Sequence, residues 1–149
     1  MRNSMWFKFG VVLAGVTGAA SAVLPTSANA ATKVRNLTLL VQQNFSDCSN
    51  ANVSSAPPAV VGGEGQVTQR DGGQTTVNIR LTKVAPNTSY NFFLKCHFQL
   101  GVIKTDATGH GNNTFTFQTN VTGPIYAFDM YPDGAPLGNK YQSVQINFQ

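Results

Sequence analysis

Apolar and polar residues alternate with a period of two through most of the sequence after residue 31, which is the pattern of β-strands with one buried face. The same region shows no stretch of apolar residues at helical spacing. The most regular alternation covers residues 90–100 and predicts one strand there. Its core-facing positions are expected to be Tyr90, Phe92, Leu94, Cys96, Phe98 and Leu100. The pattern therefore predicts an all-β protein in which Cys96 points into the core.

Further short alternating runs predict the other strands, separated by residues that favour turns. Strands are expected over 34–42, 66–70, 75–84, 102–105, 114–119, 125–131 and 143–148, with a short one near 59–61. The residues Asp71-Gly72-Gly73-Gln74 predict a hairpin, because glycine accepts the positive φ that such turns need. Seven or eight strands at about this spacing predict a single antiparallel β-sandwich.

One local segment sharpens the fold prediction. Residues 84–90 read Val-Ala-Pro-Asn-Thr-Ser-Tyr and lead into the long alternating strand. They resemble the L-x-P-x-T-x-Y segment of fibronectin type III and related immunoglobulin-like domains. In those families the tyrosine hydroxyl hydrogen-bonds to the backbone upstream and fixes a corner between sheets. The resemblance implies an immunoglobulin-like sandwich and gives Tyr90 this corner role.

A second segment carries a weaker likeness. Residues 102–109 read Val-Ile-Lys-Thr-Asp-Ala-Thr-Gly. They resemble the V-T-A-D-A-N-G stretch of the secreted apoproteins of enediyne chromoprotein antibiotics, which share an Ala-rich leader and a mature chain of similar length. This likeness implies an alternative function, the transport of a small apolar ligand outside the cell.

The first thirty residues have the pattern of a bacterial signal peptide. Arg2 and Lys8 precede an apolar run over 11–24, and Ala28-Asn29-Ala30 places small residues where a signal peptidase cuts. We therefore expect a signal peptide over 1–30 and a secreted domain over 31–149. No later apolar run has the roughly 20 residues that cross a bilayer, so no membrane span is expected.

The two cysteines, Cys48 and Cys96, fit this compartment. Secreted proteins form disulfides readily, so one Cys48–Cys96 bridge is expected, with two free buried thiols as the alternative. The role of the bridge would be structural, because neither cysteine lies in a C-x-x-C motif.

Charge and histidine content argue against several functions. The net charge of +4 is small, and the basic residues are scattered, so nucleic acid is not an expected partner. The two histidines, His97 and His110, are expected to be exposed polar residues without a nucleophile beside them. The oxygen-rich segment 105–113 is expected to be a turn capped by Asp106 and not a calcium loop. We expect no catalytic residues, no metal and no cofactor.

The segment from residue 126 to residue 141 is the best candidate for recognition, because it concentrates aromatic and charged residues around two prolines. The alternative interpretation is a strand covered on both faces followed by an ordinary loop. The candidate binding residues are Tyr126, Phe128, Asp129, Tyr131, Asp133, Lys140 and Tyr141. The expected function is that of an exported non-enzymatic binding, cell-surface or structural protein, whose partner is a protein, a polysaccharide or a small apolar ligand outside the cytoplasm.

Overall fold

The computed structural model describes residues 31–41, 46–135 and 140–149. The expected signal peptide and residues 136–139 of the candidate recognition loop lie outside these ranges. The strands are β1 (Thr32–Val41), β2 (Val61–Arg70), β3 (Gln74–Leu81), β4 (Ser89–Leu94), β5 (Phe98–Lys104), β6 (Gly111–Gln118), β7 (Ile125–Tyr126), β8 (Phe128–Tyr131), β9 (Tyr141–Ser143) and β10 (Ile146–Asn147). One turn of 3-10 helix follows β6 at Thr119–Val121.

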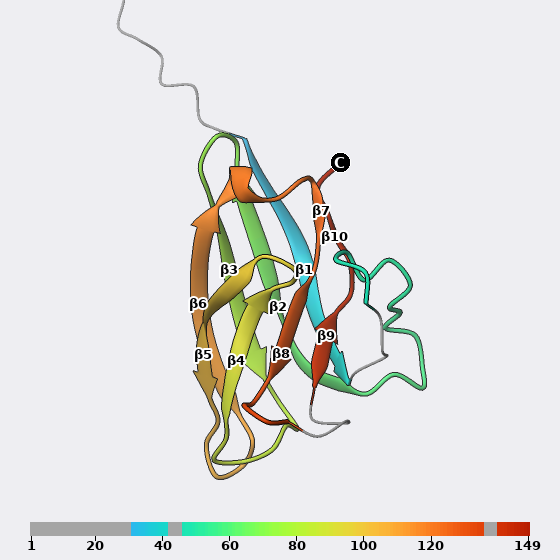
Figure 1. Cartoon of the computed structure of the whole chain (residues 1–149), viewed down its shortest axis with the longest axis vertical. Helices are drawn as coiled ribbons and strands as arrows, with labels where there is room; N and C mark the ends of the chain where they lie inside the picture. Colours follow the sequence, from blue (N-terminus) through green and yellow to red (C-terminus); the bar gives the residue numbers. More distant parts are fainter. Residues whose placement is uncertain (1–30, 42–45, 136–139) are drawn as a thin grey trace, which may run out of the picture.

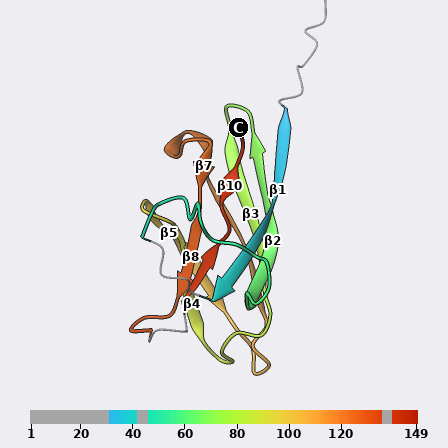
Figure 2. The same ribbon diagram turned by 90° about the vertical axis from the view of Figure 1, so that its right-hand side faces the viewer.

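Eight of these strands form one antiparallel sheet in the order β5-β4-β8-β9-β1-β2-β3-β6, and β7 pairs with β10 in a second, two-stranded sheet. The large sheet curls into two layers, one with β4, β5 and β8 and the other with β1, β2 and β3 (Figures 1 and 2). Its two edge strands meet, since the side-chain amide of Asn113 on β6 donates to the carbonyl of Val102 on β5 at 3.0 Å. The result is an all-β, antiparallel arrangement intermediate between a barrel and a sandwich, which confirms the predicted fold class.

The space between the layers is filled by large apolar side chains. The ring of Phe92 lies between those of Phe115 and Phe128, with ring centroids 5.2 and 5.3 Å apart. Alternate residues of the strands in both layers supply the rest of the core, because every second side chain of a strand points to the same face. The expected inward positions Val77, Ile79 and Leu81 of β3 are buried.

The strand expected over 90–100 is two strands joined by a tight turn. Lys95, Cys96 and His97 form this turn, and Cys96 has a positive φ of 61°. The turn ends the alternation, so Lys95 is buried and Cys96 is exposed. Phe98 is 44% exposed. The prediction that Cys96 and Phe98 point into the core was therefore wrong.

The predicted disulfide is present although Cys96 is on the surface. Cys48 and Cys96 are bonded, with 5.5 Å between their Cα atoms. Cys48 belongs to the long connection between β1 and β2, so the bridge fastens this connection to the β4–β5 turn. No strand is formed at Ala59 or Val60. Of the short strand expected near 59–61, only Val61 is in a strand, as the first residue of β2, which continues to Arg70.

Two other expected strands are divided. The run over 125–131 becomes β7 and β8, and the residue between them, Ala127, is fully buried. The chain changes sheets at this point, because β7 pairs with β10 while β8 pairs with β4 and β9. The run over 143–148 is divided in the same way between β9 and β10. The β2–β3 hairpin forms as predicted, with Gly72 at a φ of 66°. None of the described residues forms a helix that is long and apolar enough to cross a membrane.

Candidate functional site

Aromatic side chains gather on the outer face of β4 and β8. Phe92 and Met130 point into the core, so their neighbours in sequence, Phe93 and Tyr131, point outward. The two outward rings stack, with centroids 4.8 Å apart and planes 17° from parallel. Lys140 places its ammonium 5.5 Å from the centre of the Tyr131 ring, within the range of a cation–π contact. We call Phe93, Phe98, Tyr131 and Lys140 the aromatic patch.

A row of polar side chains borders the aromatic patch. The side-chain amide of Asn91 on β4 donates to Asp133 Oδ1 at 2.7 Å, in the loop after β8. The side-chain amide of Gln99 on β5 donates to Asn91 Oδ1 at 2.9 Å. A shallow hollow of about 290 Å³ lies beside this row and is lined in part by Phe93, Phe98 and Tyr131. Rings, amides and a carboxylate are thus presented together by three neighbouring strands and the loop after β8.

Only part of the predicted recognition segment reaches this surface. Tyr131, Asp133 and Lys140 lie at or beside the aromatic patch, while Asp129 lines the hollow and is mostly buried. Tyr126 and Phe128 belong to the core and are not available to a ligand, which corrects the prediction for both residues. The physical reason is that residues 126 and 128 are two positions apart and both face the core, where their rings pack edge to face with centroids 5.8 Å apart.

Tyr141 is also a core residue and was wrongly predicted to contact a ligand. Its ring lies where a side chain of residue 62 would be, since a Cβ added to Gly62 would come within 2.3 Å of Tyr141 Cε1. It packs edge to face against Tyr90, with ring centroids 5.9 Å apart. Burial, with a smaller effect of Tyr90, raises the pKa of Tyr141 to about 12. The side chain is 6% exposed, so replacing Tyr141 would disturb folding before it disturbed binding.

Sequence reasoning missed Phe93, Phe98, Asn91 and Gln99. A signal for Phe93 was present, because it is an apolar ring at a position whose alternating neighbours Asn91 and Lys95 are polar. Phe98 could not be identified, because its exposure depends on the change of parity at the Lys95–His97 turn. The partners of Phe93 come from β8, so the patch exists only after two strands have paired.

A cluster of buried polar residues lies beneath the same region. The connection after Cys48 contacts β9, where the side-chain amide of the buried Asn50 donates to the carbonyl of Ser143 at 2.9 Å. Lys95 Nζ hydrogen-bonds to Asn50 Oδ1 and lies 3.9 Å from Asp129 Oδ1. Burial raises the pKa of Asp129 above its usual range, although the charge of Lys95 and hydrogen bonds from Asn50 and Gln142 act in the opposite direction.

The segment 105–113 contains the capped turn that was expected. Asp106 Oδ1 accepts hydrogen bonds from the backbone N–H groups of Thr108, at 2.8 Å, and His110, at 3.0 Å. Its pKa falls to about 2, mainly because the Thr108 hydroxyl donates to the same oxygen. His110 Nδ1 contacts that hydroxyl at 2.7 Å, and both His97 and His110 are exposed. This arrangement accounts for Asp106 as a structural residue.

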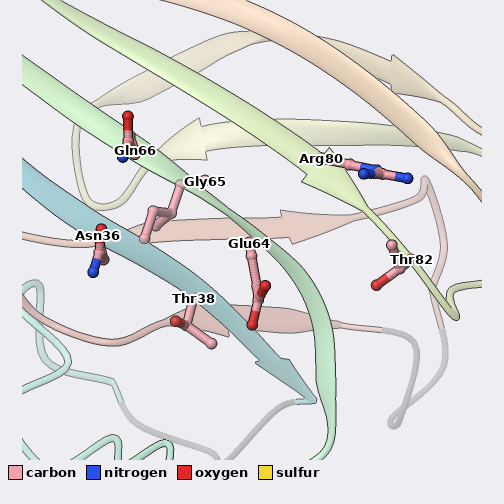
Figure 3. Close-up of a pocket in the computed structure, with 8 residues that line it drawn as sticks. Asn36, Thr38, Glu64, Gly65, Gln66, Arg80 and Thr82 are labelled. Atoms are coloured by element: carbon pink, nitrogen blue, oxygen red, sulfur yellow. The ribbon is translucent and has the colours of Figure 1, made fainter.

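A second surface hollow lies on the other layer, over β1, β2 and β3 (Figure 3). It has a volume of about 600 Å³ and is shallow. The polar side chains that line it are Asn36, Thr38, Glu64, Gln66, Arg80 and Thr82. Among the described residues, no aromatic side chain contributes to its lining. We call this surface the polar hollow; it differs from the aromatic patch in its polar lining.

Comparison of the sequence with family models finds no match, and a search of curated proteins finds no relative. The likenesses to fibronectin type III domains and to chromoprotein apoproteins therefore rest on the short segments that carry them. For the first likeness, one contact agrees: the backbone N–H of Ala85 donates to the hydroxyl of the buried Tyr90 at 3.0 Å.

Proposed function

We propose that this protein is an exported, non-enzymatic immunoglobulin-like domain that binds a glycan chain through its aromatic patch. The single observation that carries the proposal is the stacked pair Phe93–Tyr131, bordered by Lys140 and by the Asn91–Asp133 hydrogen bond. The Cys48–Cys96 disulfide supports a location outside the cytoplasm.

The chemistry of the patch suits a polyhydroxylated ligand. Aromatic rings offer apolar area for the C–H faces of sugar rings, and amide and carboxylate groups hydrogen-bond to hydroxyls. The side chains of Phe93 and Tyr131 are held by paired strands, so little conformational entropy is lost when a ligand binds. The polar row formed by Asn91, Gln99 and Asp133 would be poorly matched to a purely apolar partner, because its groups would lose their water without new hydrogen bonds.

The alternative suggested by the chromoprotein likeness, a carrier of a small apolar ligand, has less support. Such a carrier binds its ligand in an apolar cavity or cleft. The rings of Phe92, Phe115 and Phe128 stack on one another between the two layers and occupy that space. The aromatic patch, in contrast, opens to solvent.

The proposal is tested with the purified secreted protein, first on a panel of soluble and insoluble polysaccharides and then by calorimetry with the best ligand. We expect Tyr131→Ala to weaken binding by about tenfold or more, equivalent to roughly 1.4 kcal/mol, because it removes one ring of the stacked pair. Phe98→Ala should weaken binding as well. The matched controls are Gln66→Ala and Arg80→Ala in the polar hollow, which should bind like the parent.

Three results would contradict the proposal. The first is binding to none of the glycans tested, and the second is equal loss of affinity in the patch and control variants. The third is capture of an apolar small molecule or a protein that depends on Tyr131 while glycans have no effect. Melting temperatures of all variants are measured in parallel, so that a loss of binding is not confused with unfolding.

A further inference from the structure

The buried polar cluster beside the disulfide brings together three groups that can react with one another. Asn50 is fully buried and Lys95 is 7% exposed. The amine of Lys95 contacts the side-chain amide of Asn50, and the carboxyl of Asp129 lies 3.9 Å from the same amine. An amine nucleophile, an amide electrophile and a proton-transfer group are therefore adjacent, each from a different part of the chain.

We propose that Lys95 and Asn50 form an intramolecular isopeptide bond, with Asp129 as the catalytic acid and base. The bond would join the connection after β1 to the β4–β5 turn, close to the Cys48–Cys96 disulfide. The inference does not depend on the proposed glycan binding, because none of the three residues belongs to the aromatic patch.

The reaction is balanced without any added reagent. Lys95 Nζ gives up a proton to Asp129, and its lone pair attacks Cγ of Asn50 to form a tetrahedral intermediate. The neutral acid then protonates the departing nitrogen, the Cγ–Nδ2 bond breaks and ammonia leaves. The attacking Nζ then loses a second proton to Asp129, which passes it to the released ammonia. The products are the Cγ–Nζ amide, an ammonium ion and the Asp129 carboxylate, so Asp129 returns to its starting state.

The surroundings favour each step. Burial of Asp129 raises its pKa, which stabilises the neutral acid that must form when the amine is deprotonated. Asp129 Oδ1 is buried and accepts no hydrogen bond, so it is available to take up a proton. Exclusion of water also protects the intermediate from hydrolysis.

The electrophile is held in place by backbone contacts. Asn50 has a positive φ of 52°, a conformation that asparagine tolerates better than most residues. Its Nδ2 donates to the carbonyl of Ser143, and Ser143 is fixed in turn because its hydroxyl accepts from the backbone N–H of Phe128 at 2.9 Å. The amide of Asn50 is thus oriented with Oδ1 toward Lys95 and Nδ2 toward β9. A simple ion pair between Lys95 and Asp129 would not need this orientation.

Peptide mapping of the purified protein tests the bond directly. Trypsin is expected to release Asn50 in the peptide 36–70 and to cut after Lys95, giving peptides 84–95 and 96–104. The disulfide joins the same region, so the protein is first unfolded, reduced and alkylated. If the isopeptide bond is present, trypsin cannot cut after Lys95, and peptides 36–70 and 84–104 stay joined with the loss of one ammonia. Recovery of the three peptides separately, at their sequence masses, would overturn the proposal.

Variants separate the roles of the three residues. Lys95→Arg keeps a positive charge beside Asp129 but cannot form the amide, so its peptides should separate after reduction. Asp129→Asn should keep the shape of the site and leave most molecules without the bond. Asp133→Asn, a change of an exposed carboxylate in the loop after β8, should form the bond like the parent. Bond formation in Asp129→Asn at the parental level would remove Asp129 from the mechanism, and bond formation in Lys95→Arg would show that another lysine reacts.

Discussion

The hydroxyl of Tyr90 is the acceptor for a backbone N–H in a partly buried hydrogen bond. Tyr90 is fully buried, and its hydroxyl accepts from Ala85 N–H at 3.0 Å. Removing an acceptor from a buried donor costs more than an average hydrogen bond contributes, because the donor keeps its loss of hydration. The contact therefore ties the segment before β4 to the core.

We expect Tyr90→Phe to lower the free energy of unfolding by about 1–3 kcal/mol. Urea unfolding followed by fluorescence or circular dichroism measures this loss. Tyr131→Phe is the matched control, since the Tyr131 ring lies on the outer face and its change should leave the midpoint nearly unchanged. An unaltered midpoint in Tyr90→Phe would show that this hydroxyl does not stabilise the corner.

Asp106 makes stability depend on pH in a defined direction. Its pKa in the folded protein is about 2, below the ordinary value of 3.8. A depressed carboxyl pKa stabilises the folded state above the unfolded pKa, and this contribution is lost as the pH falls through the folded pKa. Stability supplied by Asp106 should therefore decrease between pH 3.8 and about 2.

The corresponding variant is Asp106→Asn, which cannot ionise. We expect its melting temperature to be lower than that of the parent at neutral pH and to fall less steeply below pH 3.8. Asp71→Asn in the exposed β2–β3 turn serves as the control. Parallel melting curves for parent and Asp106→Asn throughout the acid range would contradict this role.

Side-chain contacts that are local in the sequence were predictable, and distant ones were not, apart from the Cys48–Cys96 disulfide. The hydrogen bonds of Tyr90 and Asp106 reach backbone groups within five residues, so a short motif contains both partners. The burial of Tyr141 depends on the space left by Gly62, which belongs to a strand much earlier in the chain. An aromatic residue in a polar loop looks exposed until that strand is in position.

At the level of elements, the meeting of β5 and β6 depends on a missing side chain. A Cβ added to Gly101 on β5 would come within 2.6 Å of Phe115 Cε1 on β6. The Phe115 ring cannot move away freely, because it stacks on Phe92 in the core. The closure of the curled sheet therefore requires glycine at this position.

We expect Gly101→Ala to destabilise the protein by about 1–3 kcal/mol, the usual cost of overpacking. Chemical denaturation of the variant measures it. Gly123→Ala provides a matched control, because a Cβ added to Gly123 would meet no atom within 4 Å. Equal free energies of unfolding for the two variants would show that β5 and β6 accommodate a side chain at residue 101 without loss of stability.

The strands themselves were largely predictable, because alternation reports which face is buried. The β4–β5 turn was not, since residues 90–100 keep their alternation across it and contain no Pro, Asn–Gly or Asp–Gly signal. The turn instead uses a positive φ at Cys96, which the disulfide to Cys48 helps to hold. Because this turn was not recognised, the alternation over residues 90–100 places Lys95 on the face opposite the core, whereas Lys95 lies in the buried cluster.

At the scale of the whole molecule, the β4–β5 turn lies beside the aromatic patch and also contains Lys95 of the proposed isopeptide bond. The outer face of β4, β5 and β8 carries the aromatic patch, and the groups beneath it join this layer to the connection after β1. A layer that is fixed in this way holds Phe93 and Tyr131 in one arrangement. The protein then loses less conformational entropy when it binds a flexible polymer, which favours the proposed binding.

The Cys48–Cys96 link also affects how the molecule responds to a pulling force. The start of β1 and the end of the chain lie at the same end of the fold (Figure 1). A molecule stretched from these two ends can straighten only the chain outside the linked loop. The chain between the cysteines, which are 48 positions apart, spans roughly 160 Å when extended and is not stretched by the load. Reduction of the disulfide alone would release that length of chain. The proposed Asn50–Lys95 bond would close nearly the same loop, so with both links the extension of the molecule under force does not depend on redox conditions.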